Sequence, residues 1–389
     1  MYKSILEFIE KGTTKIEKIT KESLLSGNMM CFEEELFDTV LGFGRSLYQE
    51  ILESIEQTIR NSEVRRQSYY VEHKEDHRTL LTRFGNLEIK RAYYSSKQDG
   101  KGVYLLDKYI GLDSNEKVSL AAKAHALREA VETSYRKGGE EACLTDDVVT
   151  KQTVKNLIHD LEVEMPEEIP EKKKQIKTLH IQADEDHVAL QFYRKKGDLQ
   201  ISENGRKSNT VMPKLILLYE DIMEEGKPGS KRYRLTGKHY FGGVYEGAEA
   251  NEDLEEVERL LRKCGANAVT PGKQKEIEAC QKYIQNNWLG IIVRYDDAGA
   301  DWGCSAEGQI SHVLSARESS RPMGWSKLGV HKMTQLRVFT RNGGKVTDLL
   351  EYQHKKEQKE KRIARQDELV REVKKSHKIS GEEIVRKEI

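Results

Sequence analysis

The sequence predicts a chain of the α/β type (α+β), with a helical N-terminal region that carries a β-hairpin and a later region built on a mixed sheet. Two changes of period lead to this prediction. Apolar residues recur at helical spacing up to residue 75 and then alternate with polar residues over 78–94. Strand-like segments dominate after residues 165–177, where two of the six prolines and a run of charges indicate a linker.

The composition narrows the class of protein. Lys+Arg and Asp+Glu both number 65, so the net charge gives no preference for nucleic acid, and local clusters carry more information. With 17 Tyr, 8 Phe and 3 Trp, wholesale disorder is not expected. There is no apolar run of membrane-spanning length and no signal-peptide pattern, so we expect a cytoplasmic chain without a membrane partner. The five cysteines stand far apart without a CxxC, which favours buried thiols over a zinc site.

Residues 1–75 form the first predicted region, and we expect it to be helical throughout. Phe37, Leu41 and Ile51 belong to a long apolar pattern close to helical spacing. The basic cluster at 60–66 closes this region. Such a cluster is either a solvated helical face or a phosphate-contacting surface.

Residues 76–164 form the second region, which opens with a β-hairpin over 78–94 and a turn at Gly85-Asn86. Arg83 and Arg91 lie on this hairpin and are candidates for DNA contact. The alternative is a hairpin that only packs on the neighbouring helices.

A helix-turn-helix pattern follows the hairpin. We expect one helix over 119–135, a short one ending within 140–144, and a turn at 145–147. A second helix would then expose small polar and basic side chains that suit contact with the major groove. These DNA-binding candidates are Lys151, Gln152, Thr153, Lys155 and Asn156. A plain helical hairpin would show a similar pattern.

The region 178–353 carries the candidate chemistry. We expect strands on both sides of the acidic turn at 184–186, then strands within 210–222 and 238–247, and helices at 250–265, 276–288 and 304–320. A carboxylate at the end of a central strand, joined by others, can hold two Mg²⁺ ions about 4 Å apart. The alternative for this segment is an ordinary acidic turn. The charged residues 354–389 are expected to form a helical tail.

A second chemical feature is Glu307, which lies early on a helix rich in small residues. His312 and Arg317 follow it and could engage phosphate groups. The alternative is a helix with an ordinary solvated polar face.

Five segments in order resemble the ISLre-type insertion-sequence transposases, a family also catalogued as an uncharacterised protein family (UPF). They are IQADEDHVALQ, KHYFGGVYEG, NNWLGI, CSAEGQISHVLSARESSRPMGWSK and LRVFTRNGG. The resemblance implies a DDE-class transposase with a ribonuclease-H-like core, which uses Mg²⁺ or Mn²⁺ to cleave and join DNA strands. The resemblance implies that the DNA partners are transposon ends and target DNA in the bacterial nucleoid. It also allows the chain to form a homo-oligomer on DNA.

The resemblance also assigns site residues. Asp184 corresponds to the first aspartate, with Asp186 as its close neighbour, and Glu307 corresponds to the final glutamate. Asp184 and Glu307 would therefore be the catalytic residues and the metal ligands. His312 and Arg317 would support the DNA backbone.

The middle aspartate of the family has no clear counterpart in this chain. Asp296 and Asp297 are the nearest candidates, and the join near 255–275 resembles an internal deletion. Two carboxylates hold a metal pair more weakly than three, so we expect a degenerate copy with reduced or no activity. The alternatives are a non-enzymatic DNA-binding protein that occupies element ends, and a metal-dependent nuclease that never joins strands.

Overall fold

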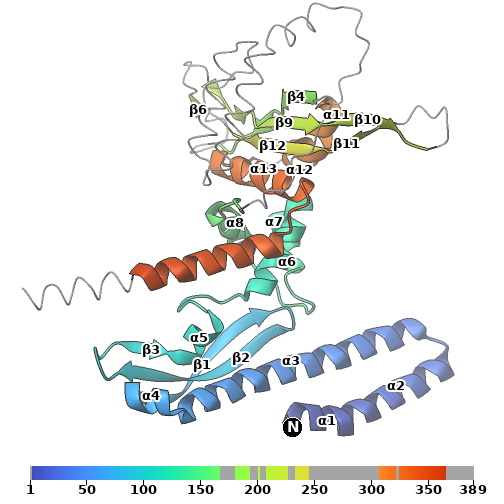
Figure 1. Cartoon of the computed structure of the whole chain (residues 1–389). Coiled ribbons are helices and arrows are strands. Elements are labelled where there is room, and N and C mark those ends of the chain that lie inside the picture. Colours follow the sequence, from blue (N-terminus) through green and yellow to red (C-terminus); the bar gives the residue numbers. More distant parts are fainter. Residues whose placement is uncertain are drawn as a thin grey trace, which may run out of the picture. The chain divides into compact units, whose positions relative to one another are not determined.

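The computed structural model describes residues 2–166, 180–192, 200–201, 207–226, 233–244, 306–320 and 324–364. The chain folds into two compact units, Met1–Val154 with Leu350–Ile389, and Lys155–Leu349 (Figure 1). Helices and sheets occur in both units, so the predicted α+β class is confirmed. The described sheets are antiparallel, so the expectation of a mixed sheet is wrong for them. Within the described ranges, no helix combines the length and the apolar character needed to cross a membrane.

The first unit begins with a long helical hairpin. The N-terminal arm consists of α1 (Lys3–Glu7), the π-helical turn η1 (Phe8–Gly12) and α2 (Thr13–Ser26). It ends at Gly27, whose φ of 66° reverses the chain direction. The returning helix α3 (Met29–Asn61) starts at Asn28, whose side chain accepts a hydrogen bond from the Cys31 amide. A short helix, α4 (Glu63–Ser68), follows.

The first sheet has the antiparallel order β1-β2-β3, with β1 (Tyr69–Thr82), β2 (Gly85–Ser96) and β3 (Gly102–Tyr104). The predicted hairpin and its Gly85-Asn86 turn are confirmed. The expectation of helix up to residue 75 is wrong from Tyr69 onward. Aromatic and β-branched residues at 69–71 favour a strand, and each of them pairs with β2.

The core of this unit lies between α3 and the hairpin. Leu52 of α3 is buried together with Leu80, Leu87 and Ile89 of the hairpin and Leu106 of α5 (Leu105–Ile110). Fully burying each such side chain contributes about 1.5–3 kcal/mol to the free energy of unfolding. The hairpin is therefore a packed part of the unit.

Three helices follow: α6 (Leu120–Glu132), α7 (Tyr135–Glu140) and α8 (Lys151–Asp160). The helix expected over 119–135 is confirmed as α6, but it ends at Glu132, and Ser134 begins the next helix. The Ser134 side chain accepts a hydrogen bond from the Lys137 amide and so starts α7. Gly138 lets α7 approach α6 closely, since a Cβ there would lie 2.4 Å from the Ala126 carbonyl oxygen. Residues 346–364 form a further helix.

The second unit contains a three-stranded antiparallel sheet of order β12-β9-β4, built from β4 (His180–Glu185), β9 (Lys214–Tyr219) and β12 (His239–Gly243). Two-stranded pairings join β5 (Val188–Ala189) with β8 (Thr210–Val211), β6 (Gln200–Ile201) with β7 (Lys207–Ser208), and β10 (Asp221–Glu224) with β11 (Tyr233–Thr236). The expected strands on both sides of the acidic turn are confirmed. The single strand expected within 210–222 is interrupted at 212–213 and at residue 220.

The helices of this unit are α11 (Ala306–Ile310), the π-helical turn η2 (Ser311–Ser315), α12 (Ala316–Glu318) and α13 (Lys327–Arg341). One face of β9 is buried in a core that includes Leu215, Leu217, Val313 and Leu314. The α11–η2 segment thus covers one side of the sheet. The helices expected at 250–265 and 276–288 lie outside the described residues.

Candidate functional site

Asp184 lies near the end of β4, on the side of the sheet that faces the helices. It pairs directly with Leu215 of β9, and directly opposed residues in an antiparallel pair project to the same face. Leu215 belongs to the same buried core as Ile310 and Leu314. Asp184 is half-buried, and its Oδ1 accepts a hydrogen bond from the Glu185 amide at 2.8 Å.

Glu307 lies on the helix that covers this same side. Helix α11 is adjacent to β4 (Figure 1). Glu307 precedes the buried Ile310 by three positions, which places both on one side of the helix. The Glu307 side chain itself is exposed. The two carboxylates predicted from the sequence therefore belong to elements that adjoin on one face of the sheet.

Carboxylate oxygens suit Mg²⁺ and Mn²⁺, so Asp184 and Glu307 have the right donor chemistry. Among the described residues, however, no three His, Cys, Asp or Glu side chains come together in a group that could hold a metal ion. Asp296 and Asp297 lie outside the described residues. The described part of the site therefore does not form a two-metal centre by itself.

A buried acid that we did not predict lies close to the end of β4. Glu318 at the end of α12 is fully buried, and the Thr334 hydroxyl donates to its carboxyl group at 3.2 Å. Burial raises the pKa of Glu318 to about 8, and the charge of Asp186 acts in the same direction. The Oδ2 atom of Asp186 is buried without a hydrogen-bond partner in the described structure. One carboxylate oxygen of Asp186 is therefore buried, unlike the carboxylate of an ordinary solvated turn.

Arg317 also belongs to this buried group, which corrects its expected role. It is 1% exposed, and its guanidinium lies 4.8 Å from the centre of the Trp325 ring. This burial leaves no surface for a DNA phosphate. A signal was present in the sequence, because Arg317 and Glu318 each follow a buried residue, Val313 and Leu314, by four positions.

His312 remains exposed on η2. Its carbonyl oxygen accepts a hydrogen bond from Arg337 Nη2 at 2.9 Å. Arg337 is 1% exposed and comes from α13, so it fixes the π-helical turn against that helix. The His312 side chain itself stays available for its predicted contact.

Helix α8 presents the predicted DNA-binding residues much as expected. Lys151, Gln152 and Asn156 are exposed, and Thr153 and Lys155 are partly exposed. The opposite side is buried through Val154 and Ile158, both 0% exposed. Thr150 begins the helix, since its Oγ1 accepts a hydrogen bond from the Thr153 amide at 3.2 Å. The helix is amphipathic in the predicted sense.

The two hairpin arginines have partners inside the first unit. Arg91 is 9% exposed, forms an ion pair with Asp107, and lies 3.6 Å from the centre of the Tyr104 ring. Arg83 donates hydrogen bonds to the carbonyl oxygens of Glu141 and Ala142. Arg91 is thus a buried structural arginine rather than a DNA contact, whereas Arg83 is partly exposed and its contact with DNA stays a prediction.

The cysteine prediction holds for the described thiols in part. Cys143 is 6% exposed, and burial raises its pKa to about 11. Cys31 is half-buried and also carries a free thiol. Cys264, Cys280 and Cys304 lie outside the described residues.

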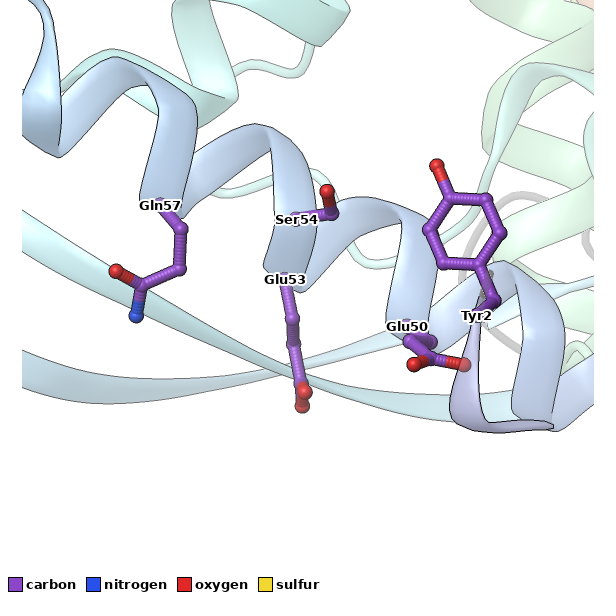
Figure 2. Close-up of a pocket in the computed structure, with 5 residues that line it drawn as sticks. All are labelled: Tyr2, Glu50, Glu53, Ser54 and Gln57. Atoms are coloured by element: carbon purple, nitrogen blue, oxygen red, sulfur yellow. The ribbon is translucent and has the colours of Figure 1, made fainter. Parts of the chain in front are cut away.

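A surface hollow lies between the start of the chain and α3 (Figure 2). Figure 2 shows its lining residues, Tyr2, Glu50, Glu53, Ser54 and Gln57. Glu50 accepts hydrogen bonds from the amides of Lys3 and Ser4 and from the Ser4 hydroxyl, which hold its pKa below the usual value. This carboxylate caps the first helix. The hollow contains none of the residues singled out from the sequence.

The fold and the site define an α+β protein with strand-end and helix-borne acids on one side of a sheet. The chain belongs to the uncharacterised protein family UPF0236, whose model matches residues 24–227 and 244–358. Similar proteins named UPF0236 occur in Caldanaerobacter subterraneus subsp. tengcongensis. One is 30% identical over 402 residues, covering 88% of this chain and 84% of its own length. A second is 30% identical, covering 87% and 84%, and a third is 31% identical, covering 79% and 76%.

No solved structure matches the chain. The family assignment therefore rests on sequence similarity.

Proposed function

We propose that this chain is a transposase-type DNA-binding protein with a ribonuclease-H-like second unit, and that its strand-cleaving centre is incomplete. The observation that carries the proposal is the placement of Asp184 on the face of the sheet covered by the helix of Glu307. Carboxylates brought together from a strand end and a neighbouring helix are ligands that could hold the metal ions of phosphoryl transfer. The resemblance to ISLre-type transposases points to the same two residues.

The exposed side of α8 supports the DNA-binding part of the proposal. Lysine and amide side chains stand there over a fully buried apolar side. Lysines neutralise phosphates, and asparagine and glutamine can pair with adenine in the major groove. Transposon-end DNA is the partner that this helix would recognise.

The names of the relatives support the proposal that genes of this family move within a genome. One relative's name joins eleven numbered designations, and another's joins four, all within a single strain. Taken as separate genes, these designations describe one protein present in many copies. Repeated copying of a gene within a genome is what an active transposon produces.

The length of the alignments supports the incompleteness. The first relative aligns over 402 residues but covers 88% of this chain, about 342 of its 389 residues. On the order of 60 aligned positions therefore have no counterpart here. A lost segment that carried the middle acid would leave Asp184 and Glu307 without their third ligand. A non-enzymatic protein that occupies element ends is the alternative favoured by this observation.

The test is cleavage and joining of labelled duplexes taken from the two flanks of the gene, with Mg²⁺ and with Mn²⁺. We expect DNA binding with little or no joining by the unaltered chain. Variants Asp184→Ala and Glu307→Ala are compared with Glu224→Ala, which alters an exposed acid on β10. Efficient joining that Asp184→Ala abolishes would contradict the incompleteness and point to Asp296 or Asp297. Cleavage without joined products would instead indicate a nuclease.

A further inference from the structure

The tip of the β1–β2 hairpin is bonded to the segment 141–150, which connects α7 with α8. The Leu144 amide donates to the Arg83 carbonyl oxygen at 2.9 Å. In return, Arg83 Nη1 donates to the carbonyl oxygens of Glu141 at 2.8 Å and Ala142 at 2.9 Å. A helix leaves its last carbonyl groups without partners inside the helix. Arg83 thus binds the chain where it leaves α7.

A second set of hydrogen bonds lies on the other side of the hairpin turn. The Asn86 amide donates to Asp147 Oδ2 at 3.1 Å, and Asn86 Nδ2 donates to Asp147 Oδ1 at 2.6 Å. The Thr145 hydroxyl donates to the same carboxylate at 2.9 Å. Gly85 makes this approach possible, because its φ is 91° and a Cβ there would lie 2.7 Å from Asp147 Oδ2.

The same end of the hairpin also holds the start of α6. The Leu81 amide donates to the Lys117 carbonyl oxygen, and the Ser119 amide donates to the Leu81 carbonyl oxygen, both at 2.8 Å. Ser119 is the residue that caps α6. The hairpin therefore fastens both the start of the helical segment and the connection before its last helix.

These hydrogen bonds matter because the connection between α7 and α8 is long. A compact helix-turn-helix uses a turn of about three or four residues. Here residues 141–150 separate α7 from α8, and all of them lie outside helices and strands. A connection of this length does not fix the direction of the following helix by itself. The hairpin tip is hydrogen-bonded to Glu141, Ala142, Leu144 and Asp147 within this connection.

We propose that Arg83, Asn86 and Asp147 are positioning residues that fix α8 as a DNA-reading helix without contacting DNA themselves. This inference rests on the proposed DNA-binding function. A positioning residue and a phosphate contact differ in what their loss changes. Loss of positioning misaligns the base-reading side chains and reduces sequence preference, whereas loss of a phosphate contact weakens binding to all sequences and lowers its salt dependence.

The experiment measures binding of the full chain to duplexes from the gene's own flanks and to an unrelated duplex of equal length, over a series of salt concentrations. For Asn86→Ala and Asp147→Ala, we expect the preference for the flank duplexes to fall by about tenfold, the value of one lost base contact. The salt slope should stay unchanged. Arg83→Ala should behave in the same way, and Arg83→Lys, which keeps a donor, should recover part of the preference.

Lys151→Ala is the matched control, because it removes an exposed cation from α8 itself. We expect its salt slope to fall by about one while the preference is kept. If Arg83→Ala, Asn86→Ala and Asp147→Ala fold but keep the full preference for the flank duplexes, the positioning role is wrong. A slope reduced by about one in Arg83→Ala would show that Arg83 contacts a phosphate.

Amide hydrogen exchange of the chain without DNA is a second measurement. It can be interpreted even when a substitution changes the stability of the chain. Asn86→Ala should speed amide exchange across 141–156 and leave α3 unchanged. Equal exchange in Asn86→Ala and in the unaltered chain would refute the proposed restraint of this segment by the hairpin tip. If the unaltered chain binds neither duplex, the proposed function fails, and a DNA-positioning role fails with it even where the exchange result holds.

Discussion

The two units use buried charge differently. In the first unit, the buried Asp107 forms ion pairs with Arg78 and Arg91, which tie both hairpin strands to α5. In the second unit, the buried Glu318 has a pKa raised to about 8 and lies in the field of Asp186, just beyond β4. Paired charges hold an architecture together, whereas an acid that titrates near neutrality responds to its surroundings. The buried ion pairs of Asp107 are therefore structural, whereas Glu318 lies close to Asp186, one of the acids that the sequence singles out.

The largest effect is expected from Asp107→Ala. The substitution leaves two arginines buried without their carboxylate, so we expect the free energy of unfolding to fall by about 3–5 kcal/mol. Urea denaturation at neutral pH measures it. Asp113→Ala is the matched control, because Asp113 is half-exposed and pairs with Lys361 at the surface, where a pair is worth about 0–1 kcal/mol. Equal losses in the two variants would contradict the structural role of the buried pair.

The second prediction concerns the pH dependence that Glu318 gives to stability. Its pKa is about 8 in the folded chain and about 4.5 in the unfolded chain, so the unfolded state loses its proton first as the pH rises. Glu318 therefore makes the chain less stable with increasing pH between these values, by a few kcal/mol in total. Glu318→Gln should remove this term and be increasingly more stable than the unaltered chain from pH 5 to pH 8.

Denaturation of both chains at several pH values provides the test. The difference between the two curves isolates Glu318 from every other titrating group. Parallel curves would mean that Glu318 has an ordinary pKa. The contrast between the two units would then disappear.

A smaller effect is expected where α7 meets the connection before α8. A Cβ on Gly139 would lie 1.9 Å from the Val149 carbonyl oxygen, so Gly139→Ala should destabilise the chain by about 1–3 kcal/mol. Gly308→Ala on α11 meets nothing within 4 Å and should be neutral or stabilise by up to about 1 kcal/mol. Thermal unfolding of both variants measures this. Similar midpoints would show that the close approach at Gly139 is not required.

Much of the local structure followed from periodicity and turn chemistry. The alternation over 78–94 and the Gly85-Asn86 turn defined the hairpin, and the buried and exposed sides of α8 matched the sequence pattern. The break at Ser134 was not predicted, because the apolar spacing continues across it and only the cap hydrogen bond marks it. The strand from Tyr69 was missed because its polar residues obscure the alternation.

The site was predictable in its strand and helix but not in its charge environment. Asp184 and Glu307 follow from local pattern and from family resemblance, since each lies at the edge of a recognisable element. The roles of Arg83 and Arg91 depend on partners further along the chain, which a local pattern does not reveal. Arg317 and Glu318 follow the buried Val313 and Leu314 at helical spacing, but the surrounding residues are polar and their burial was not predicted.

A gel-shift titration of the full chain with duplexes from the gene's own flanks at low salt tests the proposed DNA binding. We predict a complex that weakens steeply with added salt, because phosphate contacts release counterions. Lys151→Ala combined with Lys155→Ala should weaken it further and lower the salt slope by about two. Absence of a complex at low salt, or binding that the double substitution and salt leave unchanged, would contradict the proposed DNA-binding function.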